Sequence, residues 1–109
     1  MNKLKFASLE KLLEMIANKE KFHLVDVLSA ESFRDGHIPG AINMPVDLIP
    51  QQAKAKLIKT DTIVVYCASY SCTASTQAAR AFLDMGFEKV LDFKGGKKAW
   101  VNAGLALEK

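Results

Sequence analysis

One continuous stretch, residues 62–82, joins a buried strand, a short polar loop and a helix, and it constrains the fold more than any other part of the chain. Residues 63–66 read Ile-Val-Val-Tyr without alternation, which is typical of a strand buried on both faces. After the loop, Ala78, Phe82 and Met85 recur at the spacing of one helix face. A buried strand that leads into a helix predicts a parallel sheet, and therefore an α/β fold.

Strands and helices alternate in the same way along the rest of the chain. Ser8 is the expected N-cap of the first helix, and Gly86 ends the helix that follows the polar loop. With 109 residues, half of them hydrophobic, we expect a single domain over residues 1–109 in which helices cover both faces of a parallel sheet. The expected helices span about 8–18, 31–35, 50–58, 73–85 and 97–103, and the expected strands span 22–27, 42–44, 62–66 and 89–93.

Composition narrows the classes of function. The formal net charge is +3, and no basic stripe with interleaved aromatic residues occurs, so we expect no nucleic-acid partner. No apolar run approaches the ~20 residues of a membrane span. The first residues carry lysines but no apolar segment of the kind found in secretory signals. We therefore expect a cytoplasmic protein that does not bind membranes.

Both cysteines of the chain, Cys67 and Cys72, lie in the polar loop. Two cysteines are too few for a disulfide scaffold, and their spacing without a nearby histidine matches zinc poorly, so we expect no metal. Cys67 stands at the carboxyl end of the strand and faces the N-terminus of the next helix, whose free N–H groups stabilise a thiolate. This placement predicts a nucleophilic Cys67 with a lowered pKa. The alternative is a buried structural cysteine.

With these residues in view, the chain resembles the single-domain rhodaneses, the thiosulfate sulfurtransferase family, from about Ser8 to Gly104. Five segments carry the resemblance in order: 24–27 (Leu-Val-Asp-Val), 33–45 (Phe-Arg-Asp-Gly-His-Ile-Pro-Gly-Ala-Ile-Asn-Met-Pro), 64–67 (Val-Val-Tyr-Cys), 78–87, and 90–96 followed by Trp100. The resemblance implies a three-layer rhodanese-like α/β domain, with a central parallel sheet of about five strands flanked by helices.

The resemblance also implies persulfide chemistry. Cys67 would be the nucleophile that takes sulfur from thiosulfate or another persulfide donor and passes it to a thiol or cyanide. No metal or organic cofactor is needed, because the cysteine persulfide carries the sulfur. The implied partners are a small anionic donor, the acceptor and a possible sulfur-relay protein, with the chain a monomer. Backbone N–H groups of the active-site loop would cradle the sulfur; this loop comprises Ala68, Ser69, Tyr70, Ser71, Cys72 and Thr73.

The chain departs from the family pattern at three positions. Tyr70 stands where active members often have glycine, and a glycine-free loop needs a different curl because other residues avoid positive φ. Leu28 stands where arginine is frequent, which implies the loss of an internal ion pair. Cys72 stands where arginine, threonine or serine is common. Because no basic residue lies between Cys67 and Arg80, the loop offers no cation for thiosulfate.

Two roles for Cys72 remain open. It can simply be a small residue that fits the loop. It can also be a resolving thiol that attacks a Cys67 persulfide and leaves a Cys67–Cys72 disulfide. The whole-protein alternatives are a non-catalytic rhodanese-like binding module and a thiol–disulfide redox protein. A phosphatase of the same fold needs arginine six positions after the cysteine, where this chain has Thr73.

Other conspicuous residues have structural explanations. We expect Asp26 to accept turn N–H groups, His37 to bond backbone in a tight turn, and Trp100 to pack in the core. The lysines after the last strand can form either a solvated face or a patch that attracts anionic partners, and we favour the solvated face; they are Lys94, Lys97 and Lys98.

Overall fold

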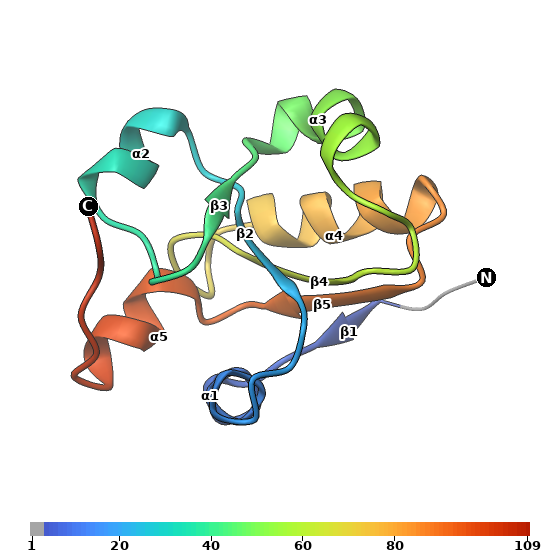
Figure 1. Ribbon diagram of the computed structural model, residues 1–109. Helices are drawn as coiled ribbons and strands as arrows, with labels where there is room; N and C mark the ends of the chain where they lie inside the picture. Colours follow the sequence, from blue (N-terminus) through green and yellow to red (C-terminus); the bar gives the residue numbers. More distant parts are fainter. Residues whose placement is uncertain (1–3) are drawn as a thin grey trace.

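The computed structural model describes residues 4–109, so residues 1–3 of the expected domain lie outside the described residues. Strands and helices alternate along nearly the whole of this part (Figure 1). In order they are β1 (Lys5–Phe6), α1 (Leu9–Ala17), β2 (His23–Asp26), α2 (Ala30–Asp35), β3 (Ile42–Asn43), the 3-10 helix η1 (Val46–Leu48), α3 (Ile49–Lys56), β4 (Thr62–Tyr66), α4 (Ala74–Asp84), β5 (Lys89–Phe93) and α5 (Gly96–Asn102).

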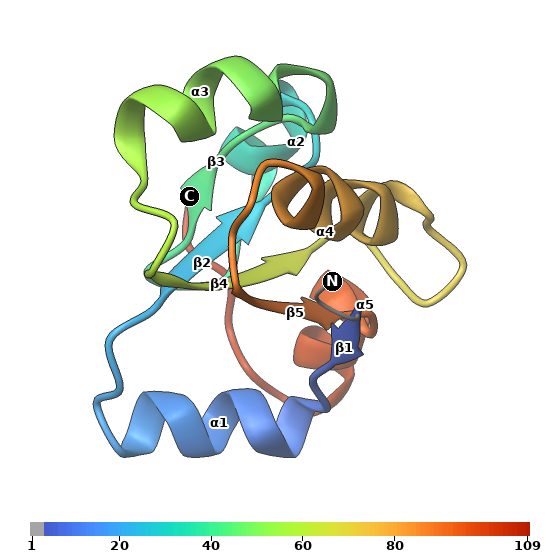
Figure 2. The ribbon, with the colours of Figure 1, turned by 90° about the vertical axis from the view of Figure 1, so that its right-hand side faces the viewer.

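The strands form one five-stranded parallel sheet in the order β1-β5-β4-β2-β3. Helices α3 and α4 lie on one face of the sheet, and α1 and α5 lie on the other (Figure 2). This confirms the expected three-layer α/β architecture. No helix among the described residues is long and apolar enough to cross a membrane.

The central strand β4 supplies side chains to both halves of the core. Ile63 and Val65 pack with α3 and α4, whereas Val64 and Tyr66 pack on the side of α1 and α5. All four are fully buried. Because successive side chains point to opposite faces, the unbroken apolar run of this strand is what a sheet covered on both faces requires.

Strands 62–66 and 89–93 have the predicted limits, and the other predicted elements are confirmed with ends shifted by one or two residues. Sequence analysis missed β1 and η1. The two residues of β1 are both exposed, and they become a strand only because Lys5 and Phe6 pair with Leu91 and Asp92. So short a segment carries no periodicity that could have been recognised.

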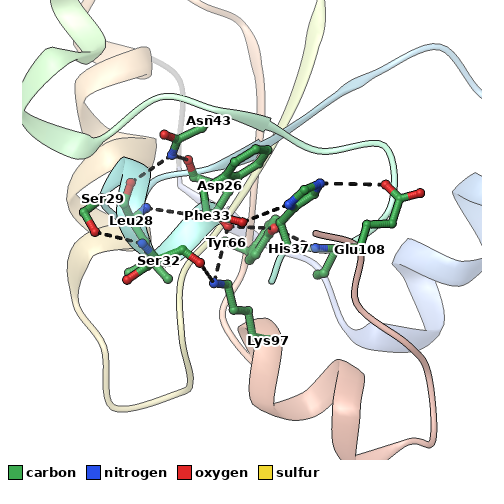
Figure 3. Close-up of polar contacts among 11 residues, drawn as sticks. Asp26, Leu28, Ser29, Ser32, Phe33, His37, Asn43, Tyr66, Lys97 and Glu108 are labelled. Carbon is green, nitrogen blue, oxygen red and sulfur yellow. Dashed lines mark hydrogen bonds and ion pairs between the residues drawn. The ribbon is translucent and has the colours of Figure 1, made fainter. Parts of the chain in front are cut away.

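A buried polar network joins the carboxyl ends of β2 and β4 (Figure 3). The fully buried Asp26 accepts the Tyr66 hydroxyl at 2.9 Å and the Leu28 N–H at 2.9 Å. The Tyr66 oxygen in turn accepts the Ile38 N–H at 3.0 Å. Burial, reinforced by the neighbouring Asp26 charge, raises the pKa of Tyr66 far above its usual value, so the hydroxyl keeps its proton. Asp26 therefore has the structural role expected of it.

Lys97 supplies the cation of this network. Its Nζ lies 3.8 Å from Asp26 Oδ2 and donates to the Ser32 carbonyl oxygen at 2.9 Å, with the side chain 17% exposed. Leu28 itself carries no charge, so the expected loss of an ion pair at that position stays a prediction, while Asp26 is paired with a lysine from α5. For Lys97, the solvated-face interpretation is wrong.

His37 and Trp100 have the structural roles expected of them. His37 Nδ1 donates to the Phe33 carbonyl oxygen at 2.9 Å, and the two rings stack with centroids 3.8 Å apart. His37 also pairs with Glu108 near the C-terminus, where Nε2 lies 3.7 Å from Oε1 (Figure 3). Trp100 is buried in the core, and its Nε1 donates to the Ala106 carbonyl oxygen at 2.9 Å.

Replacement of Tyr66 by phenylalanine should destabilise the protein, because it leaves a buried carboxylate oxygen and the Ile38 N–H without their hydroxyl partner. We expect a loss of about 2 kcal/mol or more in the free energy of unfolding, measured in urea. Tyr70→Phe is the matched control, since the Tyr70 side chain is 72% exposed, and it should change stability by less than about 0.5 kcal/mol. Equal midpoints for the two variants would contradict a stabilising role for the network.

Candidate active site

Cys67 directly follows β4, between the carboxyl ends of its neighbours β2 and β5. From β2 the chain continues outward to β3, whereas from β4 it continues to β5 on the other side. The crevice above such a reversal of strand order is where α/β sheets bind ligands. The fold therefore places Cys67 where the sequence predicted it.

The start of α5 holds the backbone of Cys67 in place. The N–H of Lys97 donates to the Cys67 carbonyl oxygen at 3.0 Å, and the N–H of Lys98 donates to that of Ala68 at 2.9 Å. Gly96 makes this approach possible. A Cβ on this residue would overlap the Cys67 carbonyl oxygen and lie 2.9 Å from its carbonyl carbon, and φ is +61°. The glycine pair thus serves close backbone packing as well as the turn.

The loop of residues 68–73 curls without help from positive φ, which none of these residues adopts. The Cys72 N–H donates to the Ser69 carbonyl oxygen at 3.0 Å, and the hydroxyls of Ser69 and Ser71 lie 3.1 Å apart. Tyr70 projects outward, with its ring 3.6 Å from the position of a Cβ on Gly95. The replacement of glycine by Tyr70 therefore alters the surface beside the loop and leaves the backbone unstrained.

The Cys67 thiol is buried, and its pKa is raised. The residue is 0% exposed, and its Sγ donates to the Cys72 carbonyl oxygen at 3.6 Å. Burial is the main cause of the raised pKa, and the interaction with Cys72 adds to it. The prediction of a lowered pKa is therefore wrong, because the loss of hydration outweighs the N–H groups at the start of α4. The groups that do favour a Cys67 thiolate are the hydroxyl and N–H of Ser75, and the N–H of Thr73 is not among them.

Cys72 has the opposite character. It is partly exposed, and both cysteines are free thiols. Burial alone would raise the pKa of Cys72, but the Cys67 thiol, the N–H groups of Ala68 and Ala74, and the Lys94 ammonium together lower it. One N–H group from the loop, that of Ala68, and one from the start of α4, that of Ala74, thus favour the thiolate of Cys72.

Lys94 supplies a cation that sequence analysis did not assign to the loop. Its Nζ donates to the Cys72 carbonyl oxygen at 2.8 Å. The lysine follows β5, which pairs with β4, so both carboxyl ends reach the same edge of the sheet. That adjacency was the signal that could have identified it. Lys94 also lines a groove of about 570 Å³ together with Phe6, Ala7, Ser8 and Tyr70.

Sequence analysis also missed Ser75, which looks like an ordinary residue of the first turn of a helix. It is fully buried, and its Oγ has no hydrogen-bond partner among the described residues. Because this hydroxyl lowers the pKa of Cys67, it is placed to donate to the sulfur when the thiol ionises. A buried hydroxyl that has no other partner and favours the Cys67 thiolate is a feature that a purely structural cysteine does not require.

Thr73 lies at the edge of this arrangement. It precedes α4 and is exposed, and its hydroxyl accepts the Gln77 side-chain amide at 3.1 Å. Among residues 4–109, no group of three histidine, cysteine or acidic side chains is placed to hold a metal ion. Around Cys67 the structure brings together a second thiol, a lysine and a buried serine.

Comparison with known proteins places these features in a family. The family model for the rhodanese-like domain matches residues 8–103. A sulfurtransferase from Allochromatium vinosum is 33% identical over 98 residues, which cover 90% of this chain and 89% of the relative. The thiosulfate sulfurtransferase GlpE of Shewanella oneidensis is 31% identical over 104 residues, covering 94% and 98%.

Solved structures agree with the sequence comparisons. The solution structure of a rhodanese-like domain from Anabaena matches with a TM-score of 0.86 at 31% identity, covering 97% of this chain and 80% of that one. Several other relatives are longer proteins, of which this chain spans less than half.

Gly96→Ala should open the active-site loop. Alanine at position 96 would have a strained left-handed backbone, and its Cβ would overlap the Cys67 carbonyl group. Gly104→Ala is the control, because φ there is also positive, at +84°, but no atom lies within 4 Å of the added Cβ. Strain alone costs about 1 kcal/mol. We expect Gly96→Ala to lose clearly more stability in urea than Gly104→Ala, and to expose Cys67 to faster alkylation under native conditions. Equal stability and equal alkylation of the two variants would contradict the packing role of Gly96.

Ser75→Ala should raise the pKa of Cys67 further, because the variant lacks the hydroxyl that favours the thiolate. In a Cys72→Ser background, which leaves one thiol to titrate, alkylation of Cys67 should shift to higher pH. Near neutral pH it should slow by about tenfold, the effect expected for one hydrogen bond to a charged group. Ser71→Ala changes an exposed serine and is the control; it should leave the pH dependence of Cys67 alkylation unchanged. A profile unchanged by Ser75→Ala would exclude a role for this hydroxyl.

Proposed function

The chain belongs to the family of rhodanese-like domains, and on that premise we propose that it is a sulfurtransferase that carries sulfane sulfur as a persulfide on Cys67. The donor is thiosulfate or another persulfide, and the acceptor is a thiol or cyanide. Relatives that carry the names sulfurtransferase and thiosulfate sulfurtransferase over nearly their whole length support this class of reaction.

One observation carries the proposal. Cys67 stands at the carboxyl end of the central strand, its backbone is held by the first turn of α5, and a buried serine hydroxyl with no other partner is placed to serve its sulfur. A purely structural cysteine needs no such hydroxyl. This favours a reactive sulfur over the alternative of a non-catalytic binding module.

In the proposed cycle, the Cys67 thiolate attacks the outer sulfur of thiosulfate. The sulfur–sulfur bond of the donor breaks, and sulfite leaves with the electron pair. The acceptor thiolate or cyanide then attacks the outer sulfur of the persulfide, and the Cys67 thiolate leaves. The transferred sulfur keeps its oxidation state through both steps, so the proposal needs no metal or organic cofactor.

The surroundings of the loop fit an anionic donor. Lys94 provides positive charge beside Cys72, and the adjoining groove offers room for a small anion or for a segment of a partner protein. In this proposal the chain acts as a cytoplasmic monomer, and a sulfur-relay protein supplies or receives the sulfur.

A second candidate function is thiol–disulfide exchange between Cys67 and Cys72. The observation that favours it is the contact of the two cysteines, in which each thiol affects the pKa of the other. Here Cys72 would attack the inner sulfur of a Cys67 persulfide, forming a disulfide and releasing hydrosulfide.

Intact-mass analysis after incubation with thiosulfate or glutathione persulfide tests the proposal. We expect the wild type and Cys72→Ser to hold one additional sulfur after gel filtration, and peptide mapping should place it on Cys67. Cys67→Ser should hold no stably bound sulfur. Loss of two hydrogens from the wild type, with sulfur retained by Cys72→Ser, would favour the thiol–disulfide function. Absence of sulfur from every variant would reject the transferase.

A further inference from the structure

The two thiols of the site differ in their exposure to solvent. Cys67 is 0% exposed, and its Sγ is directed at the carbonyl oxygen of Cys72. Cys72 is partly exposed and lies against the same core cluster, next to Cys67. A donor that arrives from solvent therefore meets Cys72 first.

We propose that Cys72 is the receiving thiol, which takes the sulfane sulfur from the donor and passes it inward to Cys67. This inference rests on the proposed sulfurtransferase function, and it replaces the direct attack of Cys67 on the donor with two successive exchanges. It assigns Cys72 a catalytic role that differs from that of a resolving thiol, because the cysteine acts before Cys67 carries sulfur.

The charges around the loop support this order. Lys94 Nζ lies 2.8 Å from the Cys72 carbonyl oxygen, so positive charge is concentrated at Cys72. Together with the N–H groups of Ala68 and Ala74, this lysine lowers the pKa of Cys72, whereas burial raises that of Cys67. Near neutral pH the larger thiolate fraction therefore belongs to the outer cysteine, and the thiolate is the nucleophile.

The receiving step balances without any further reactant. The Cys72 thiolate attacks the outer sulfur of thiosulfate, the sulfur–sulfur bond of the donor breaks, and sulfite leaves with the electron pair. The product is a Cys72 persulfide. No net oxidation occurs, because the new bond replaces an equivalent bond of the donor.

The inward step is a second exchange of the same kind. The Cys67 sulfur attacks the outer sulfur of the Cys72 persulfide, and the bond between that sulfur and Cys72 breaks. The electron pair moves to the Cys72 sulfur, which takes up the proton that Cys67 releases. A thiol of low pKa is the better leaving group, so the same groups that make Cys72 the first nucleophile also help it to leave.

The destination suits a stored persulfide. Cys67 is enclosed by the core, and the Ser75 hydroxyl has no other hydrogen-bond partner among the described residues. Sulfur bound there is shielded from water and from stray thiols, whereas sulfur on Cys72 remains accessible. The arrangement separates the reactive acceptance of sulfur from its protected storage.

Rapid-quench labelling tests the order of the two cysteines. The protein is mixed with thiosulfate or glutathione persulfide, quenched with iodoacetamide at increasing times, and mapped for alkylated persulfide at each cysteine. In the wild type we expect label on Cys72 before Cys67. Cys67→Ser should show label on Cys72 at the wild-type initial rate when quenched at once, and this exposed persulfide should be lost during gel filtration. Cys72→Ser should load Cys67 at least about tenfold more slowly than the wild type.

Two further variants serve as controls. Lys56→Gln removes an exposed positive charge at the end of α3, outside the loop, and should load at the wild-type rate. Lys94→Gln should slow loading when Cys72 is present and have no additional effect in the Cys72→Ser background, because the lysine acts through Cys72.

Loading of Cys72→Ser at the wild-type rate would overturn the inference and leave the Cys67 transferase intact. The same holds if Cys67→Ser collects no label at early times while the wild type fills normally. Absence of sulfur from both cysteines in every variant would instead reject the proposed function itself, so the two failures are distinguishable.

Discussion

The structure depends on the close contact between the backbone of Cys67 and the first turn of α5. Gly96 has no side chain, so the Lys97 N–H can reach the Cys67 carbonyl oxygen at 3.0 Å. The side chain of the same lysine turns back to Asp26, 3.8 Å away, and Asp26 accepts the hydroxyl of Tyr66, the residue just before Cys67. One lysine thus ties the start of α5, the end of β2 and the end of β4 together. The position of the sulfur follows from this closed set of contacts.

That rigidity has a chemical consequence. A cysteine held so firmly in the core loses hydration, and this loss raises the pKa of its thiol more than the Ser75 hydroxyl and N–H lower it. Enclosure and reactivity therefore oppose each other at Cys67. In the proposed relay, the partly exposed Cys72 accepts the sulfur instead, because it keeps contact with solvent, backbone N–H groups and Lys94. The second cysteine complements the first because the two sit in different environments only a few residues apart in the sequence.

The fold could be predicted from the sequence largely because the central strand β4 is an apolar run and because strand segments alternate with helical ones along the chain. Strand β4 and the position of Cys67 at its end followed directly from residues 63–67. Strand β1 could not be predicted, because its two residues gain their structure only from pairing with β5. The roles of Lys94 and Ser75, and the direction of the Cys67 pKa shift, were missed for a related reason. Each depends on which segments pack beside the loop and on how much water they exclude. A local sequence pattern contains neither kind of information.

The loop departs from the family pattern in two ways: Tyr70 changes the surface beside the loop, and Cys72 changes its reactive groups. Tyr70 replaces a glycine without strain, because the loop turns through the Cys72 N–H to Ser69 bond with no residue at positive φ, and the ring extends over Gly95. This change alters what a donor or a partner protein meets at the surface. Cys72 replaces a residue that cannot carry sulfur, at a position whose carbonyl oxygen accepts the Cys67 thiol. In our proposal this change adds a second sulfur carrier, and the cation beside the loop is Lys94, which follows β5 and donates to the Cys72 carbonyl oxygen. The loop has therefore kept its backbone support while its reactive groups have been redistributed.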